Sequence, residues 1–459
     1  MPVLVDEDLR FFDESGPRPS AVVNRWLCDR PTNGAPTPAS WAVYARAMRA
    51  WLEFLQERGV RLFDDRERLR AALAMYAEHR FAGPLEARLA PATWNLQIGV
   101  VAAFYRWAVA EDLAAAEPFS YAAASRYGAS RGHTAERNLA KVRAPRRHVR
   151  IKHLEADFTA LFVRALEGLE PDGCVDRSFR GRDPARNAAM AQLILSSGLR
   201  RQEFTHLLVY EVPPLPVEPT VVPSPLVVAA AIAKGRKQRT TWASYAALAA
   251  VHRYMTLERP LVADGSSWRP DPRLGPPLIV SDADGHGGVV NGRRVAWSRL
   301  GPRERLRLVS VTGGSSLFAL RRGGGSFVDW ATVFARASAR IRERFEPRFP
   351  HVNPHRLRHT FAMSTLERLV AGYYQRAAAL VADTDENPAL ALYLTQADPL
   401  MVLRDLLGHT SVATTEVYLS RLDTARVYRD AYEHAGRVSG LSAAEQRELD
   451  DEWPGEAEG

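Results

Sequence analysis

The sequence has few cysteines, few lysines and no long apolar segment. Two cysteines, Cys28 and Cys174, are present among 459 residues, which argues against a disulfide framework or a structural zinc site and favours a reducing compartment. The longest apolar run, 226–233, has the length of a strand, whereas a bilayer span needs about 20 residues. The first 16 residues are acidic and lack the apolar stretch of a secretory signal. We therefore expect a cytoplasmic protein without membrane association.

Positive charge is abundant but unevenly distributed. Lys plus Arg number 61 against 53 Asp plus Glu, for a net charge of +8. Residues 445–459 contain seven acids and one base, so this acidic tail carries −6 and residues 1–444 carry +14. A basic body with an acidic tail indicates a polyanionic partner, although a soluble basic protein without such a partner has the same composition. Four of the bases are lysines: Lys141, Lys152, Lys234 and Lys237.

The N-terminal part is patterned as a small helical domain. Residues 1–36 are polar and contain Pro and Gly, so we expect an irregular lead-in. Apolar residues spaced three and four apart begin near Ala39 and predict a first helix that ends at Gly59. Further helices are predicted at 66–79 and after Pro91, with Thr93 as the candidate N-cap. Together these patterns predict a helical domain over residues 37–120.

A basic linker is predicted over residues 121–152. Its hydrophobicity is low, and Glu136 is its one acid between 126 and 152. Such a segment fits a strap that crosses a phosphate backbone, and it also fits a solvated connector. Nine bases contribute to it: Arg126, Arg131, Arg137, Lys141, Arg143, Arg146, Arg147, Arg150 and Lys152.

Residues 153–440 are patterned as a second, mixed α/β domain, so the fold class is mainly α with a small β-sheet or hairpin. Two strands, 221–232 and 239–244, are predicted on either side of the turn 234–237. Two stretches, 262–326 and 371–399, are predicted insertions, and 441–459 is the acidic tail. Helices are predicted by apolar periodicity at 154–169, 185–197, 245–258, 330–341, 354–370, 399–407 and 411–420.

Four short segments carry side chains suited to phosphate chemistry. The segment 198–203 reads Gly-Leu-Arg-Arg-Gln-Glu after an apolar helix, and 233–239 is a basic hairpin tip. In 353–362, Asn353 and Pro354 are typical of a helix start, and His355 and Arg358 then share one helix face. The fourth segment, 406–418, contains Gly-His at 408–409 and ends at Tyr418.

In this order the four segments resemble the tyrosine recombinase (phage integrase) family. That family combines Arg in a Gly-Leu-Arg-x-x-Glu segment, a hairpin Lys, a His-x-x-Arg-His helix, a Gly-His pair and a Tyr nine residues after the second His. The resemblance spans about residues 35–435 and implies an N-terminal helical core-binding (SAM-like) domain followed by a catalytic α/β domain. It implies a catalytic set of Arg200, Lys234, His355, Arg358, His409 and Tyr418. The intervals from Lys234 to His355 and from Arg358 to His409 are longer than in compact members.

The chemistry of these side chains agrees with that resemblance. Guanidinium groups at Arg200 and Arg358 bind a phosphate through paired hydrogen bonds. Tyr418 is the expected nucleophile. A phenol has a pKa of about 10, so it needs a base, and His355 is the best candidate. His409 is expected to donate a hydrogen bond to the phosphate. Lys234, with Lys237 as the fallback, is expected to protonate the leaving 5′-oxygen, which an arginine does poorly.

The resemblance further implies a site-specific recombinase that cuts and rejoins duplex DNA through a 3′-phosphotyrosyl intermediate. No metal, ATP or other cofactor is expected. Four copies are expected to assemble on paired DNA sites, most simply for a mobile element, with resolution of replicon dimers as an alternative role. The bases expected to contact DNA are Arg126, Arg131, Lys141, Arg143, Arg146, Arg147 and Arg150.

Other interpretations stay open at this point. Glu203 is expected to orient Arg200, and His359 to support the site without reacting. Tyr428 and Tyr432 are alternative nucleophiles, but neither has the family spacing from the Gly-His pair. A topoisomerase IB-like enzyme and a DNA-binding protein without catalysis are the alternative functions. Replacing the expected nucleophile with Phe separates catalysis from binding alone.

Overall fold

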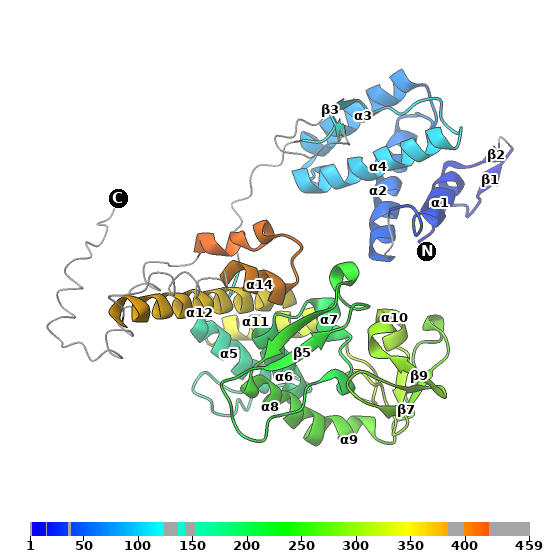
Figure 1. Cartoon of the computed structure of the whole chain (residues 1–459). Coiled ribbons are helices and arrows are strands. Elements are labelled where there is room, and N and C mark those ends of the chain that lie inside the picture. Colours follow the sequence, from blue (N-terminus) through cyan, green and yellow to red (C-terminus); the bar gives the residue numbers. More distant parts are fainter. Residues whose placement is uncertain are drawn as a thin grey trace. The chain divides into compact units, whose positions relative to one another are not determined.

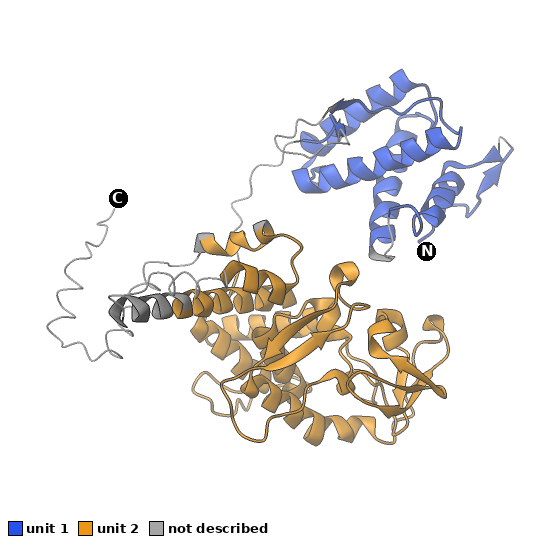
Figure 2. Ribbon diagram, viewed as in Figure 1, with its two compact units in different colours: residues 1–148 blue, residues 149–459 orange. Residues whose placement is uncertain are grey.

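The chain forms two compact units, residues 1–148 and residues 149–459 (Figure 2). The computed structural model describes residues 2–14, 16–34, 38–123, 136–142, 152–383 and 399–421. The boundary between the units lies inside the stretch 121–152 that the sequence predicts as a linker. No helix in the described part of the chain is long and apolar enough to cross a membrane.

The first unit is built from helices (Figure 1). Asp65 caps α3 by accepting a hydrogen bond from the backbone N–H of Arg68 at 2.8 Å. The cap predicted at Thr93 is wrong, because α4 begins at Pro91, whose ring suits the first helical position, and Thr93 lies inside the helix. The elements are β1 (Phe12–Asp13), β2 (Gly16–Pro17), α1 (Pro19–Asp29), α2 (Pro38–Glu57), α3 (Arg66–Phe81), α4 (Pro91–Ala110), β3 (Tyr121–Ala123) and β4 (Glu136–Asn138).

The core of the first unit is aromatic. Trp26 of α1 is fully buried and meets Phe104 of α4 edge-on at 5.6 Å between ring centroids. The prediction that 1–36 is irregular is therefore wrong for α1, because its apolar face completes this core. Trp51 donates a hydrogen bond to the hydroxyl of Tyr105 at 3.2 Å, so the polar edges of these two buried rings are satisfied.

The predicted linker begins inside the first unit. Strands β3 and β4 pair as an antiparallel hairpin. Beyond it, the indole N–H of Trp94 donates to the carbonyl of Ala140 at 2.9 Å, and Asn95 bonds both backbone groups of Val142. The domain boundary predicted at residue 120 therefore lies too early in the sequence, because residues 136–142 are hydrogen-bonded to α4.

Helices outnumber strands in the described part of the second unit, in line with the predicted mainly helical class (Figure 1). Helix α6 is buried over most of its surface and packs against α5, α8 and α12, which makes it the centre of the core. Asn353 caps α12 as expected, since its side chain accepts from the N–H of Arg356 at 2.9 Å. The helices are α5 (Ala156–Glu167), α6 (Pro184–Ser197), α7 (Arg201–Thr205), α8 (Tyr245–Arg253), α9 (Arg259–Ala263), α10 (Pro302–Arg305), α11 (Trp330–Arg344), α12 (Pro354–Asp383) and α14 (Pro399–Leu407).

Two separate sheets are present among the described residues of the second unit. Strands β5 (Ser224–Val228) and β6 (Arg239–Ala243) form an antiparallel ladder whose tip contains the 3₁₀ turn η3 (Lys234–Arg236). The predicted insertion 262–326 contains a four-stranded sheet of order β10-β7-β8-β9 with its own small core. These strands are β7 (Leu278–Ala283), β8 (Gly287–Val290), β9 (Arg293–Ala296) and β10 (Leu308–Ser310).

A buried arginine fastens the inserted sheet to the rest of the unit. Arg305 is fully buried and donates two hydrogen bonds to the carboxylate of Glu211, at 2.5 and 2.7 Å. It also donates to the carbonyls of His206, Leu300 and Trp297. All three guanidinium nitrogens are thus satisfied, which a buried charge requires.

The C-terminal elements differ from their predicted form. Residues 371–383, predicted as part of an insertion, continue α12. The helix predicted at 411–420 is wrong: two 3₁₀ turns, η7 (Val412–Thr414) and η8 (Glu416–Arg421), occupy this stretch. Their bonds span three residues, as from the N–H of Tyr418 to the carbonyl of Thr415 at 3.0 Å. Residue 399 begins α14, and residues 384–398 and the acidic tail lie outside the described residues.

Candidate active site

The first predicted segment lies where α6 meets α12. Gly198 ends α6 with a φ of 62°, and a Cβ added there would lie 2.2 Å from the ring of Phe361. Only glycine fits both the conformation and the close approach of the two helices. Arg200 follows at the start of α7, and its backbone N–H donates to the carboxylate of Glu203 at 2.7 Å.

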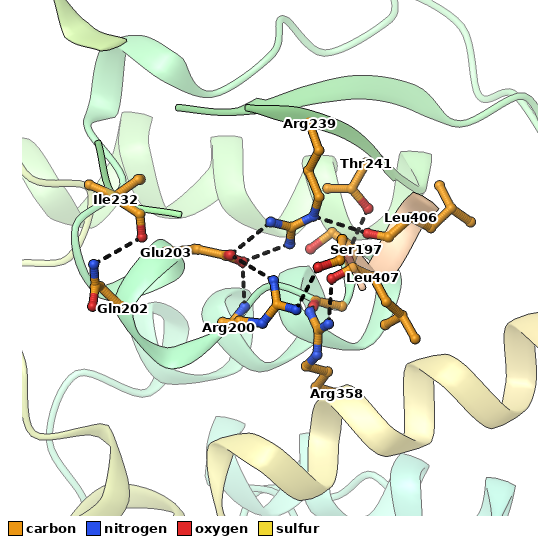
Figure 3. A network of polar contacts seen from close by, with 12 residues as sticks. Ser197, Arg200, Gln202, Glu203, Ile232, Arg239, Thr241, Arg358, Leu406 and Leu407 are labelled. Carbon is orange, nitrogen blue, oxygen red and sulfur yellow. Dashed lines mark hydrogen bonds and ion pairs between the residues drawn. The ribbon is translucent and has the colours of Figure 1, made fainter. Parts of the chain in front are cut away.

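Glu203 is the buried anion of the site. Its side chain is 1% exposed and accepts two hydrogen bonds from Arg239, both at 2.7 Å. It also accepts one from the guanidinium of Arg200 at 3.3 Å (Figure 3). Burial raises the pKa of Glu203, but its bonds with the two arginines outweigh burial, so the pKa lies below its ordinary value. The carboxylate is charged and orients Arg200, in line with the supporting role that the sequence suggests.

Arg239 is the residue that sequence reasoning missed. Besides its bonds to Glu203, its Nε donates to the carbonyl of Leu406 in α14 at 3.1 Å. Arg239 therefore joins β6, α7 and α14, three elements far apart in the sequence (Figure 3). A signal was available: Arg239 shares its strand parity with the buried Thr241 and Ala243, and a charge on an inward position requires a partner.

Arg358 lies beside Arg200 and is almost fully buried. Its guanidinium donates to the carbonyls of Gly198 and Leu407, the second at 2.5 Å. Arg200 donates to the next carbonyl, that of Gly408, at 3.0 Å. Burial and the neighbouring charge of Arg200 lower the pKa of Arg358 to about 9. Two guanidinium groups from segments about 160 residues apart thus converge on one turn.

His409 belongs to the same turn. Gly408 turns the chain with a φ of 62°, and a Cβ there would lie 2.8 Å from Arg239. The Nδ1 of His409 is 3.0 Å from the hydroxyl of Thr415. Burial, together with the charges of Arg358 and Arg200, lowers the pKa of His409 to about 4. The imidazole is therefore neutral at pH 7, and in the tautomer that accepts from Thr415 at Nδ1 its Nε2–H is available as a donor.

Tyr418 lies in η8 and is 2% exposed, packed with Leu403, Leu407 and Phe361. Its hydroxyl is 2.8 Å from the Nδ1 of His359. Burial raises the pKa of this phenol, while Arg358 and Arg200 act in the opposite direction; the net pKa is raised. The charges of both arginines therefore reach the hydroxyl.

The two histidines of α12 differ in their contacts. His355, which the sequence favours as the base, is exposed, and within the described part of the chain no hydrogen bond joins it to Tyr418. Its ring lies edge-on to that of His359, with 4.2 Å between centroids. Although its side chain is exposed to solvent, neighbouring protein atoms partly desolvate the ring, and this desolvation and the charges of Arg358, Arg200 and Lys234 lower its pKa. The histidine that the sequence treats as supporting is the one that contacts the expected nucleophile.

Lys234 and Lys237 are exposed at the tip of the β5–β6 hairpin. The hairpin base is fixed, because Thr241 donates to the carbonyl of Ser197 at 2.6 Å and Gln202 donates to that of Ile232 at 3.1 Å (Figure 3). Lys234 is close enough to lower the pKa of His355 and of His409. Neither ammonium group has a hydrogen-bond partner among the residues described.

Of the bases predicted to contact DNA, Lys141 is described and is exposed after β4. Tyr428 and Tyr432, the alternative nucleophiles, lie outside the described residues. So do six of the predicted linker contacts: Arg126, Arg131, Arg143, Arg146, Arg147 and Arg150. Over the described ranges, no group of three or more His, Cys, Asp or Glu side chains is arranged to hold a metal ion.

The site thus combines two guanidinium groups, neutral imidazoles and a buried phenol around the turn 407–409. Such a set suits an anionic, tetrahedral or pentacoordinate phosphorus centre, because paired N–H donors bind its oxygens. The phenol is a nucleophile of the kind that forms covalent phosphoesters.

No protein-family model matches the chain, and no curated protein matches it. Among solved structures, the chain is similar to the XerH site-specific recombinase bound to its palindromic difH substrate, at 13% identity and a TM-score of 0.46, covering 90% of this chain and 84% of that one. It is similar to the Tn1549 transposon integrase in complex with transposon right end DNA, at 14% identity and a TM-score of 0.46, with 89% and 98% covered. It is also similar to the XerA recombinase, at 16% identity and a TM-score of 0.33, with 90% and 98% covered.

Proposed function

We propose that this protein is a tyrosine-type site-specific DNA recombinase. The observation that carries the proposal is the convergence of Arg200, Arg358, His409 and Tyr418 around one turn, where Arg200 contacts the carbonyl of Gly408, 208 residues away in the sequence. A network of ion pairs that only stabilised the fold would not require a phenol beside two clustered guanidinium groups. A phosphodiester supplies the negative charge that this cluster lacks.

In the proposed reaction, Arg200 and Arg358 hold the non-bridging oxygens of one phosphate, assisted by the Nε2–H of His409. The phenol oxygen of Tyr418 attacks phosphorus, and the bond to the 5′-oxygen breaks. Lys234 donates a proton to that leaving oxygen. The 3′-phosphotyrosyl bond conserves the energy of the cleaved bond, so the reverse attack by a 5′-hydroxyl rejoins DNA without ATP or metal.

The proposed partner is duplex DNA carrying specific recombination sites. Four copies assemble on two paired sites and exchange strands, with a mobile element as the proposed context and the nucleoid in the cytoplasm as the location. The first unit and the bases of 126–150 supply contacts to the phosphate backbone, Lys141 among them.

The test is recombination on a plasmid that carries two copies of one duplex, selected by the full chain from a random-sequence pool. The reaction contains EDTA and no ATP. We expect a deletion product with the wild type and none with Tyr418→Phe. Relaxation of supercoils without deletion would instead identify a topoisomerase IB-like enzyme, and binding without either product would identify a DNA-binding protein without catalysis.

A further inference from the structure

The hydroxyl of Tyr418 has one close polar neighbour in the described site, the Nδ1 of His359 at 2.8 Å. The two rings are 5.7 Å apart between centroids. Tyr418 is 2% exposed, so water has almost no access to its side chain. A buried hydroxyl beside a ring nitrogen is a donor–acceptor pair by geometry alone.

The local structure fixes this pair from both sides. His355 and His359 are four residues apart on α12 and share one face. The second of them lies one turn further into the helix, beside Thr360, whose hydroxyl accepts from the N–H of Leu154 at 2.9 Å. On the other side, the 3₁₀ bond from Tyr418 to Thr415 directs the phenol toward α12.

We infer that His359 takes the proton of Tyr418 when the phenol attacks the DNA phosphate. The inference rests on the proposed function. The O–H bond of the phenol breaks, the proton passes to Nδ1 of His359, and the phenol oxygen bonds to phosphorus. The bond to the 5′-oxygen breaks, and Lys234 protonates that oxygen. On rejoining, His359 returns its proton to the phenol oxygen while Lys234 accepts the proton of the attacking 5′-hydroxyl.

The surroundings keep His359 able to accept this proton. The ionisable groups that face it are His355 and Arg358 on α12, His409 after α14, His153 before α5, and the phenol itself. Burial and the other cationic groups lower the pKa of His359 to about 4, so the ring is neutral at pH 7. The bound phosphate supplies the negative charge that stabilises the imidazolium formed during attack.

The test compares two leaving groups in the full-length protein. The probe is the duplex selected from a random-sequence pool, with either oxygen or sulfur at the 5′-bridging position of the cleaved phosphate. A thiolate leaves without protonation, because the pKa of the thiol is about 8.5. The variants are His359→Phe, which keeps a ring without an acceptor, and His359→Asn, whose amide oxygen replaces Nδ1. Lys234→Ala and the exposed His351→Phe are controls.

We expect His359→Phe to form the covalent adduct about 100-fold more slowly on both probes, as loss of a general base does. His359→Asn regains most of that rate, and His351→Phe keeps the full rate. Lys234→Ala is slow on the oxygen probe and normal on the sulfur probe. In His359→Phe the rate should rise tenfold per pH unit above pH 7, whereas the wild-type rate is flat there.

The inference fails, while the proposed function stands, if the wild type forms the adduct and His359→Phe forms it at an equal or greater rate. Restoration of His359→Phe by the sulfur probe would also overturn it, because the residue would then serve the leaving group. Equal defects in the Phe and Asn variants with an unchanged pH profile would assign His359 to packing. If the wild type forms no adduct on either probe, the proposed function fails and the inference with it.

Discussion

Replacing Arg239 with Met tests the role of the buried ion pair behind the two phosphate-binding arginines. The change removes two hydrogen bonds of 2.7 Å to Glu203 and one of 3.1 Å to Leu406. The side chains of the pair are 8% and 1% exposed, so the carboxylate would be left charged and without its main partner. Breaking a buried pair in this way costs about 3–5 kcal/mol. We expect the second unit to lose stability by that amount.

The chain offers a matched control for this prediction. Arg273 also binds a carboxylate through two nitrogens, that of Asp271, but its side chain is 89% exposed. Arg273→Met should therefore cost less than about 1 kcal/mol. Calorimetry of the full chain is the appropriate assay, because two compact units need not melt in one transition.

A catalytic consequence accompanies the loss of stability. Without Arg239, the carboxylate of Glu203 has Arg200 as its remaining guanidinium partner. The carboxylate would then draw the guanidinium of Arg200 away from the phosphate. Removing a charged donor of this kind lowers the cleavage rate by about 100- to 1000-fold. The combined variant Glu203→Gln with Arg239→Met should recover stability relative to Arg239→Met, because the buried charge is gone. The reasoning is refuted if Arg239→Met and Arg273→Met lose the same stability.

Three further predictions concern packing, pH and salt. Gly198→Ala should destabilise the second unit by about 1–3 kcal/mol, because the new Cβ would lie 2.2 Å from the ring of Phe361. Gly173→Ala should cost less, because Gly173 also has a positive φ, of +91°, but open space around it. Calorimetry of both variants tests this difference. His409 has its pKa lowered from 6.5 to about 4, so the unfolded chain binds more protons in that range. Stability should be complete above pH 6.5 and fall as the pH drops toward 4, and His409→Asn should flatten this dependence in melts at several pH values; an equal slope would contradict the burial argument. The last of these predictions replaces four linker bases with Gln: Arg143, Arg146, Arg147 and Arg150. The slope of the logarithm of the DNA-binding constant against the logarithm of salt concentration should become shallower by about 0.9 for each phosphate that the linker no longer neutralises. An unchanged slope in binding titrations would identify the linker as a solvated connector.

Local signals predicted most of the helices and the β-hairpin well. The Asn353-Pro354 start of α12 is confirmed, since it depends on capping alone. The hairpin flanking 234–237 is confirmed by the ladder of β5 and β6. The mainly helical class with a small hairpin is likewise confirmed. These features follow from residues that are neighbours in the sequence.

Features that depend on distant contacts were missed. α1 forms because Trp26 fills an aromatic core, which a polar and Pro-containing sequence does not reveal. The stretch 411–420 is predicted as a helix, yet its hydrogen bonds span three residues. His355 and His359 lie one turn apart on the same helix, so the sequence alone does not tell which of them meets the phenol. Predicting the contacts of Arg239 required knowing that its strand packs against α14.

The central claim is that Tyr418 is a nucleophile toward DNA. The most direct measurement traps the protein on a nicked form of the selected duplex in EDTA, digests the adduct and locates the DNA-linked peptide by mass spectrometry. The account predicts that the linkage maps to Tyr418 and that Tyr418→Phe binds the duplex with equal affinity but forms no adduct. An adduct that persists in Tyr418→Phe and maps to Tyr428 or Tyr432 would contradict it, as would tight binding without any adduct in the wild type.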